Sequence, residues 1–283
     1  MEATVRALMA RHLPSYAVRT VSVLGTGLEN IAYDVNGEFV VRVSLAAPDE
    51  RAAVVGREAL ILDRVALVST LPVPSVEFVD AEEGVLAYRR LAGSPLLVSP
   101  HRGEDVGSAI GVFLGAIHGA SGMADVTPSE RFPMADWVSD AARDYRAVAS
   151  ALTSGERSVI EAFLATPPPP GTTRECFCHN DFGAEHILVD EAGNVTGVID
   201  WSDAAMTDPA YDWGLVWRDL GPRVFADGLA AYEHDFDDAD VARAVFYARC
   251  ALIEDFAYGI RDGRTAYLAA ARHHFAHVFH SEL

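Results

Sequence analysis

The sequence predicts an α+β fold in two lobes, a β-rich N-terminal lobe over about residues 1–93 and a larger, mainly helical lobe over about 94–283. A hairpin signal, Asn36-Gly37, lies between two short apolar runs of the first third. A helical period follows from about residue 106, and the turn-rich stretch 92–95 separates the two patterns. With 283 residues, 50% of them hydrophobic, the chain can bury a large core.

In the first part, strands of alternating or continuous apolar residues flank one amphipathic helix. Two prolines, at 72 and 74, end that helix. The expected elements are strands at 21–24, 31–35, 39–43, 76–79 and 85–88 and a helix at 51–68.

In the second part, apolar residues at helical spacing predict helices over 106–118 and within 135–165, ending before the proline run 167–170. Two short strands, 187–189 and 195–199, are joined by a turn-rich loop. Helices are expected again after Asp208-Pro209.

The chain is strongly acidic and contains no lysine, so all 22 basic residues are arginines. Residues 1–93 hold 9 Arg against 12 acids, a net charge of −3, and residues 94–283 hold 13 against 29, a net charge of −16. This balance excludes nucleic acid and anionic membranes as partners. It favours either a cationic ligand for the second lobe or simple solubility.

Cysteine usage and hydropathy predict a cytoplasmic protein. Three cysteines are an odd, small number, typical of reduced thiols. The apolar runs are far shorter than the roughly 20 residues of a membrane span. Cys176-x-Cys178 followed by His179 has metal-like spacing, but without a second cysteine pair we interpret these residues as small buried thiols.

Polar residues gather around the predicted hairpin 187–199. Antiparallel pairing places the start of its first strand beside the end of its second, which brings His186 and Asp200 together, with Asp181 on the preceding loop. Such convergence suits a metal-nucleotide site with an adjacent base.

The pattern His179-x-Asp181-x4-His186, followed by Ile199-Asp200-Trp201 and Asp208-Pro209-x2-Asp212, resembles the aminoglycoside phosphotransferase family, whose fold is related to that of protein kinases. Within that family the chain is most similar to the aminoglycoside 2″-phosphotransferases and the macrolide 2′-phosphotransferases. The resemblance implies a bilobal kinase-like fold, with Mg²⁺ and GTP or ATP bound between the lobes.

The resemblance also implies roles for individual residues. Asp181 would be the catalytic base, and Asp200 and His186 would stand at the metal positions, although a histidine is an unusual ligand for Mg²⁺. Arg42 would replace the phosphate-binding lysine of kinases, with Glu58 as its ion-pair partner. The remaining implied contacts are Gly25 and Gly27 at the phosphates, Tyr88 and Leu91 near the base, and Asp203, Asp219, Glu254, Asp255 and Tyr258 at the acceptor.

The resulting hypothesis is an antibiotic kinase that phosphorylates a hydroxyl of an aminoglycoside. One alternative is a macrolide 2′-phosphotransferase, which would need Trp217, Phe256 and Tyr258 as an open apolar wall. Another alternative is a nucleotide-binding pseudokinase that regulates a partner.

Overall fold

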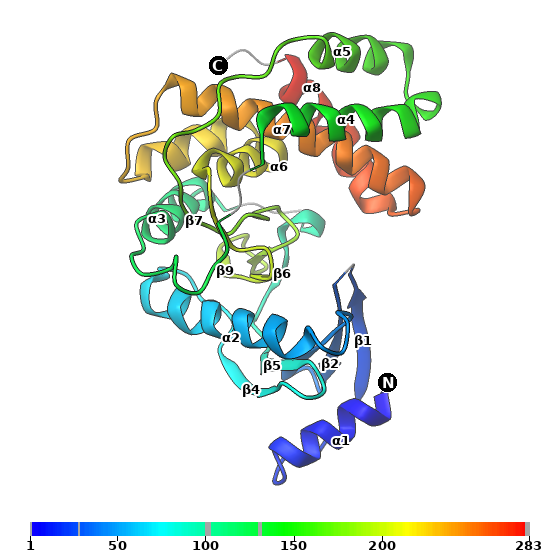
Figure 1. Ribbon diagram of the computed structural model, residues 1–283, viewed down its shortest axis with the longest axis vertical. Coiled ribbons are helices and arrows are strands. Elements are labelled where there is room, and N and C mark those ends of the chain that lie inside the picture. The colour runs from blue at the N-terminus through cyan, green and yellow to red at the C-terminus, as the bar shows by residue number, and fades with distance from the viewer. Residues whose placement is uncertain (1, 28, 100–102, 130–131, 281–283) are drawn as a thin grey trace.

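The computed structural model describes residues 2–27, 29–99, 103–129 and 132–280, arranged as a β-rich lobe and a helical lobe stacked along the long axis (Figure 1). The predicted α+β two-lobed class is therefore confirmed. Among the described residues, no helix combines the length and apolar character needed to span a bilayer.

The N-terminal lobe contains a five-stranded antiparallel sheet in the order β1-β2-β3-β5-β4. Asn36 and Gly37 both adopt positive φ, 58° and 74°, in the turn between β2 and β3, as the Asn-Gly signal predicted. The strands are β1 (Val21–Thr26), β2 (Asn30–Val35), β3 (Phe39–Ser44), β4 (Val76–Asp80) and β5 (Val85–Arg89).

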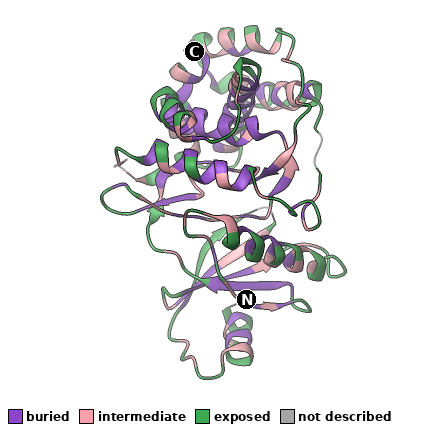
Figure 2. Ribbon diagram, turned by 90° about the vertical axis from the view of Figure 1, so that its left-hand side faces the viewer, coloured by how far each residue is buried: buried purple, intermediate pink, exposed green. Residues whose placement is uncertain are grey.

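Buried residues gather in the sheet of this lobe (Figure 2), and in β3 five of the six residues are buried. Phe39 and Val41 belong to the core cluster formed with α1 (Glu2–His12), whereas Val40 belongs to the cluster formed with α2 (Arg51–Val68). Side chains alternate along a strand, so Arg42 lies on the same face as Val40, toward α2. The helix α2 was predicted with the observed bounds, whereas α1 was missed because charged residues obscure its few buried apolar positions.

The C-terminal lobe is built around α6 (Pro209–Ala231), which packs against α3, α7 and α8. Asp208 caps its first turn by accepting from Ala210 N, and Gly221, at φ 80°, interrupts its helical geometry. The other helices are α3 (Val106–His118), α4 (Met134–Val148), α5 (Ser154–Leu164), α7 (Asp238–Arg261), α8 (Thr265–His280) and the 3₁₀ turns Leu96–Val98 and Ala149–Ala151.

Short strands of this lobe position the polar loop of the predicted site. The strand β8 (Ile187–Val189) pairs antiparallel with β9 (Val195–Val198) and with β6 (Ser94–Pro95), and β7 (Cys176–Cys178) pairs with β10 (Ala205–Thr207). The strands β6, β7 and β10 were not predicted, because their partners lie far away in the sequence, whereas 187–189 is joined to 195–199 by one turn-rich loop.

Candidate active site

The β8–β9 hairpin brings His186 and Asp200 to the same end of the sheet, as the sequence predicted. Ile187 pairs with Val198, and the amide of Ile199 donates to the carbonyl of His186 at 2.9 Å. Asp200 follows directly in a left-handed conformation, with φ 64°. The pairing of two short strands thus fixes the backbone positions of His186 and Asp200.

Asp181 lies within reach of His186, with 3.0 Å between the carboxylate Oδ2 and the imidazole Nε2. Burial disfavours the imidazolium, but the Asp181 carboxylate outweighs this effect and raises the pKa of His186 to about 9. Burial likewise opposes ionisation of Asp181, and His186 holds the pKa of that carboxyl below its ordinary value. At neutral pH the two groups form an ion pair.

Arg42 joins the two lobes. Its Nη1 donates to Glu58 Oε1 on α2 at 2.5 Å, and its Nη2 donates to Asp200 Oδ1 at 2.8 Å. The expected contact between Arg42 and Glu58 is therefore present, and it extends to Asp200. Burial tends to lower the Arg42 pKa, but the two carboxylates prevail and hold it above its ordinary value.

The carboxylate of Asp200 remains ionised in this cluster. Burial opposes its charge, yet the Arg42 guanidinium lowers its pKa to about 2. The hydroxyl of Ser202 also donates to Oδ1, at 3.0 Å. The Asp200 side chain is 35% exposed, so it faces solvent from the junction of the lobes while Arg42, at 6%, does not.

Two carboxylates of α6 hold the loop that carries Asp181. Asp212 accepts from the backbone amides of His179 and Asn180 at 2.9 and 2.8 Å, and Asp219 accepts from the amide of Ala184 at 2.8 Å. Positions 212 and 219 lie two turns apart on one helix face, so they brace the loop on both sides of Asp181. Asp219 was predicted at the acceptor, but it is 3% exposed, also bonds Arg218, and does not line the cavity that Asp181 faces.

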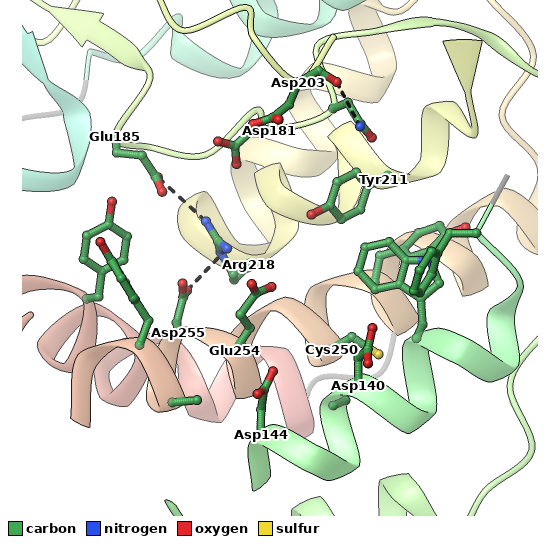
Figure 3. A pocket seen from close by; sticks show the side chains of 18 of the residues that line it. Asp140, Asp144, Asp181, Glu185, Asp203, Tyr211, Arg218, Cys250, Glu254 and Asp255 are labelled. Carbon is green, nitrogen blue, oxygen red and sulfur yellow. Dashed lines mark hydrogen bonds and ion pairs between the residues drawn. The ribbon is translucent and has the colours of Figure 1, made fainter. Parts of the chain in front are cut away.

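Asp181 faces a cavity of about 710 Å³ between the loop, α4, α6 and α7 (Figure 3). Four of the five residues predicted at the acceptor line this cavity; they are Asp203, Glu254, Asp255 and Tyr258. Asp255 is nevertheless engaged, because Arg218 Nη1 lies 3.3 Å from its Oδ2. Acidic side chains outnumber the basic ones, which are Arg143, Arg218, Arg261 and His186.

The apolar wall predicted for a macrolide is wrong in two of its three residues. Trp217 and Phe256 are both fully buried in the core, so only Tyr258 lines the cavity. Other aromatic side chains line it instead. They are Phe132, Trp137, Tyr211, Tyr247 and Tyr267.

The helix α4 contributes cavity residues that the sequence interpretation missed. Trp137, Asp140, Ala141 and Asp144 all line the cavity. Their spacing of three, four and seven residues places them on one helical face, a signal that was readable in the sequence. It was overlooked because polar residues on a helix usually indicate a solvent-facing side.

The residues expected at the nucleotide lie around the lobe junction. Gly25 lies in β1, where it pairs with Ala32, and Gly27 directly follows this strand, with its N donating to Asn30 O at 3.0 Å; both glycines are exposed. Tyr88 is buried on the α2 side of β5, and Leu91 is half-buried in the connection to the second lobe. A small hollow of about 20 Å³, lined by Arg42 and Ser202, adjoins these elements.

The donor set at the lobe junction fits Mg²⁺ through Asp200. Mg²⁺ is typically bound by one or two carboxylates together with water and substrate phosphates. Arg42 and Ser202 both donate to Oδ1 of Asp200. Among the described residues these two bonds involve the same oxygen, so Oδ2 remains for a metal ligand bond. His186 fits less well, because its nitrogen is a soft donor and its raised pKa keeps it protonated.

A two-lobed α+β fold with a loop carboxylate facing a cavity, and an arginine bridging the lobes, defines a kinase-like phosphotransferase. The sequence profile of the phosphotransferase enzyme family (APH) matches residues 20–245, and the chain belongs to this family. Its predicted identification as an enzyme of that family is therefore confirmed.

Curated relatives and solved structures agree with this assignment. Viomycin phosphotransferase of Streptomyces vinaceus is 26% identical over 200 residues, 66% of this chain and 68% of that protein. The uncharacterized protein YcbJ of Bacillus subtilis (strain 168) is 40% identical over 55 residues, which span 19% of this chain and only 18% of that protein.

Two solved structures share the fold. Aminoglycoside 2'-phosphotransferase-IIIa in its GDP complex superimposes with a TM-score of 0.72, at 17% identity over 98% of this chain and 97% of that one. The macrolide 2'-phosphotransferase MphH from Brachybacterium faecium gives 0.64, at 24% identity over 99% of both chains.

Replacing Arg42 tests the link between the lobes. Arg42→Ala leaves Glu58 buried without its cation and should lower the free energy of unfolding by about 3 kcal/mol, with loss of most activity. Arg42→Lys should give a stability and an activity between those of the wild type and Arg42→Ala. Lysine keeps the positive charge but lacks the planar guanidinium that contacts two carboxylates. Denaturant unfolding and nucleotide-dependent turnover measure both effects. The control Arg19→Ala removes an exposed pair and should change stability by less than about 0.5 kcal/mol; equal results for both alanine variants would contradict the bridge.

Proposed function

We propose that the protein is a cytoplasmic antibiotic kinase that transfers the γ-phosphoryl group of GTP or ATP to a hydroxyl of an aminoglycoside. The observation that carries this proposal is the position of Asp181 on the wall of a cavity rich in carboxylates. In this proposal residues 1–93 bind the nucleotide, and residues 94–283 supply the base and the acceptor site.

The residues of the chain divide the chemistry among them. The Asp181 carboxylate accepts or orients the proton of the acceptor hydroxyl, and the Arg42 guanidinium binds the phosphate oxygens. Asp200 would hold Mg²⁺, which would supply neutralisation of charge on the phosphates. His186 positions Asp181 through their ion pair. Gly25 and Gly27 allow the β1–β2 turn to approach the phosphates, and the connection at Tyr88 and Leu91 contacts the base.

An aminoglycoside carries several ammonium groups, and the cavity offers carboxylates on two helices to bind them. Asp140 and Asp144 come from α4 and Glu254 from α7, on the side of the cavity opposite Asp181 (Figure 3). Arg143 lies 2.5 Å from Asp140 and 3.9 Å from Asp144, so an ammonium group would compete with it for these two carboxylates. Carboxylates in that position would concentrate a polycation and turn a hydroxyl toward the base. Solved relatives with this fold include complexes with kanamycin and gentamicin.

A macrolide is the second candidate, and the aromatic side of the cavity favours it. The Trp137 ring lies 5.0 Å from the Tyr211 ring and 5.2 Å from the Tyr247 ring, measured between centroids. Together these rings could cover the apolar face of a large acceptor that has a single amine. A solved macrolide phosphotransferase has the same fold.

The direct test is phosphate transfer from GTP and from ATP to a panel of aminoglycosides, macrolides and viomycin. Asp181→Asn should bind nucleotide normally but turn over about 10²- to 10⁴-fold more slowly, because the base is lost. The exposed Asp227→Asn serves as the control. Unchanged turnover in a folded Asp181→Asn protein would remove Asp181 from this role, and nucleotide binding without transfer to any acceptor would favour a pseudokinase.

Asp203 should make acceptor binding depend on pH. Burial, with the nearby Asp181 charge, raises the pKa of Asp203 to about 7, so its carboxylate forms as the pH rises through that value. The KM for a cationic acceptor should therefore fall between about pH 6 and pH 8. In Asp203→Asn this component should vanish, whereas Asp227→Asn retains it. The acceptor's own amines titrate equally in both variants, so identical profiles would exclude Asp203 from acceptor binding.

Salt distinguishes the two acceptor classes. The Debye length falls from about 10 Å at 0.1 M to about 3 Å at 1 M salt, so the KM for an aminoglycoside should rise steeply while that for a macrolide stays nearly flat. Glu254→Gln should raise the aminoglycoside KM up to about tenfold, about 1.4 kcal/mol. Glu191→Gln, at an exposed residue, is the matched control and should leave the aminoglycoside KM unchanged. A KM independent of salt, with turnover of a macrolide, would replace the first candidate by the second.

A further inference from the structure

The two cysteines of β7 meet a histidine on the side of the strand that faces α3. Cys176 and Cys178 are two residues apart, so both side chains lie on one face, and their sulfur atoms are 3.7 Å apart. His118, the last residue of α3, places a ring nitrogen within 4.8 Å of both sulfurs. Sequence spacing did not predict this cluster, because His118 comes from a distant part of the chain.

The geometry of the cluster suits a tetrahedral metal ion. With metal–sulfur bonds of about 2.3 Å, two thiolates of a tetrahedral site stand about 3.8 Å apart, close to the observed separation of the sulfurs. Two thiolates and one imidazole form a soft donor set that selects ions such as Zn²⁺ and Cd²⁺ over Mg²⁺. The cluster is thus chemically distinct from the oxygen donor at Asp200.

The surroundings prepare His118 for coordination. Its Nε2 lies 3.1 Å from Asp212 Oδ2, and since a carboxylate only accepts, Nε2 carries a proton, which leaves Nδ1 as the nitrogen that would bind an ion. The hydroxyl of Tyr232 donates to Nδ1 at 2.7 Å. When an ion binds Nδ1, this hydroxyl would either move away from the nitrogen or become a fourth ligand of the ion. A carboxylate behind a metal-bound histidine is the usual outer partner in zinc sites.

We propose that Cys176, Cys178 and His118 form a binding site for a thiophilic divalent cation, separate from the nucleotide and acceptor sites. Cys178 and His118 are buried, whereas Cys176 is half-buried and gives the ion a path from solvent. Asp212 also holds the amides of His179 and Asn180, so a bound ion would brace the loop that leads to Asp181.

The experiment uses the full chain, treated with a chelator, kept reduced, and supplied with excess Mg²⁺ to occupy oxygen sites. Titration with Cd²⁺ should produce a thiolate-to-metal charge-transfer absorption that saturates at one ion per chain. Zn²⁺ should raise the melting temperature in parallel. The histidines of α8 can also bind such ions, but nitrogen ligands produce no thiolate absorption.

Cys176→Ser is the decisive variant and should weaken Cd²⁺ binding at least about tenfold and remove the thermal shift. Cys250→Ser, which removes the buried thiol of α7, is the matched control and should behave as the wild type. In the wild type, bound Zn²⁺ should also protect Cys176 from alkylation, a readout that does not depend on the variant folding. Absence of the absorption in the wild type, an unchanged Cd²⁺ affinity in Cys176→Ser, or alkylation of Cys176 unaffected by Zn²⁺ would each overturn the proposal.

Discussion

The arrangement of the site depends on one buried cation, the guanidinium of Arg42. It binds Glu58 of the first lobe and Asp200 of the second, so one side chain links the α2 side of the sheet to the end of the β8–β9 hairpin. Burying such a charge is costly, and only a planar group with several donors can satisfy two carboxylates from different lobes at once. The chain has no lysine, yet its arginine makes this double contact directly.

A second constraint is the set of hydrogen bonds between α6 and the loop that carries Asp181. The carboxylates of Asp212 and Asp219 accept backbone amides on both sides of it, and a buried amide left without an acceptor would be expensive. The same helix, α6, therefore supplies the core packing of the lobe and the rigidity of its polar loop. Asp212 further binds His118, which connects the loop to the thiol cluster of β7.

Some carboxylates in and near the cavity are already paired with arginines of the chain. Arg218 pairs with both Asp219 and Asp255, so the net charge of the lobe overstates the number of carboxylates that are available to a ligand. Arg143 likewise pairs with Asp140 and lies 3.9 Å from Asp144. Asp203 and Glu254 also line the cavity, together with a set of aromatic rings. This division between charge and apolar surface explains why acceptors of two different kinds remain candidates.

The sequence by itself determined the elements whose signals are local. The Asn36-Gly37 hairpin, the helix 51–68 and the meeting of His186 with Asp200 follow from turn chemistry and from a period of two or 3.6 residues. The tertiary structure alone decided that Asp219 is structural, that Trp217 and Phe256 are core, and that His118 joins the two cysteines. These outcomes depend on which face of a helix meets which neighbour, and burial, unlike periodicity, arises from contacts between segments distant in the chain.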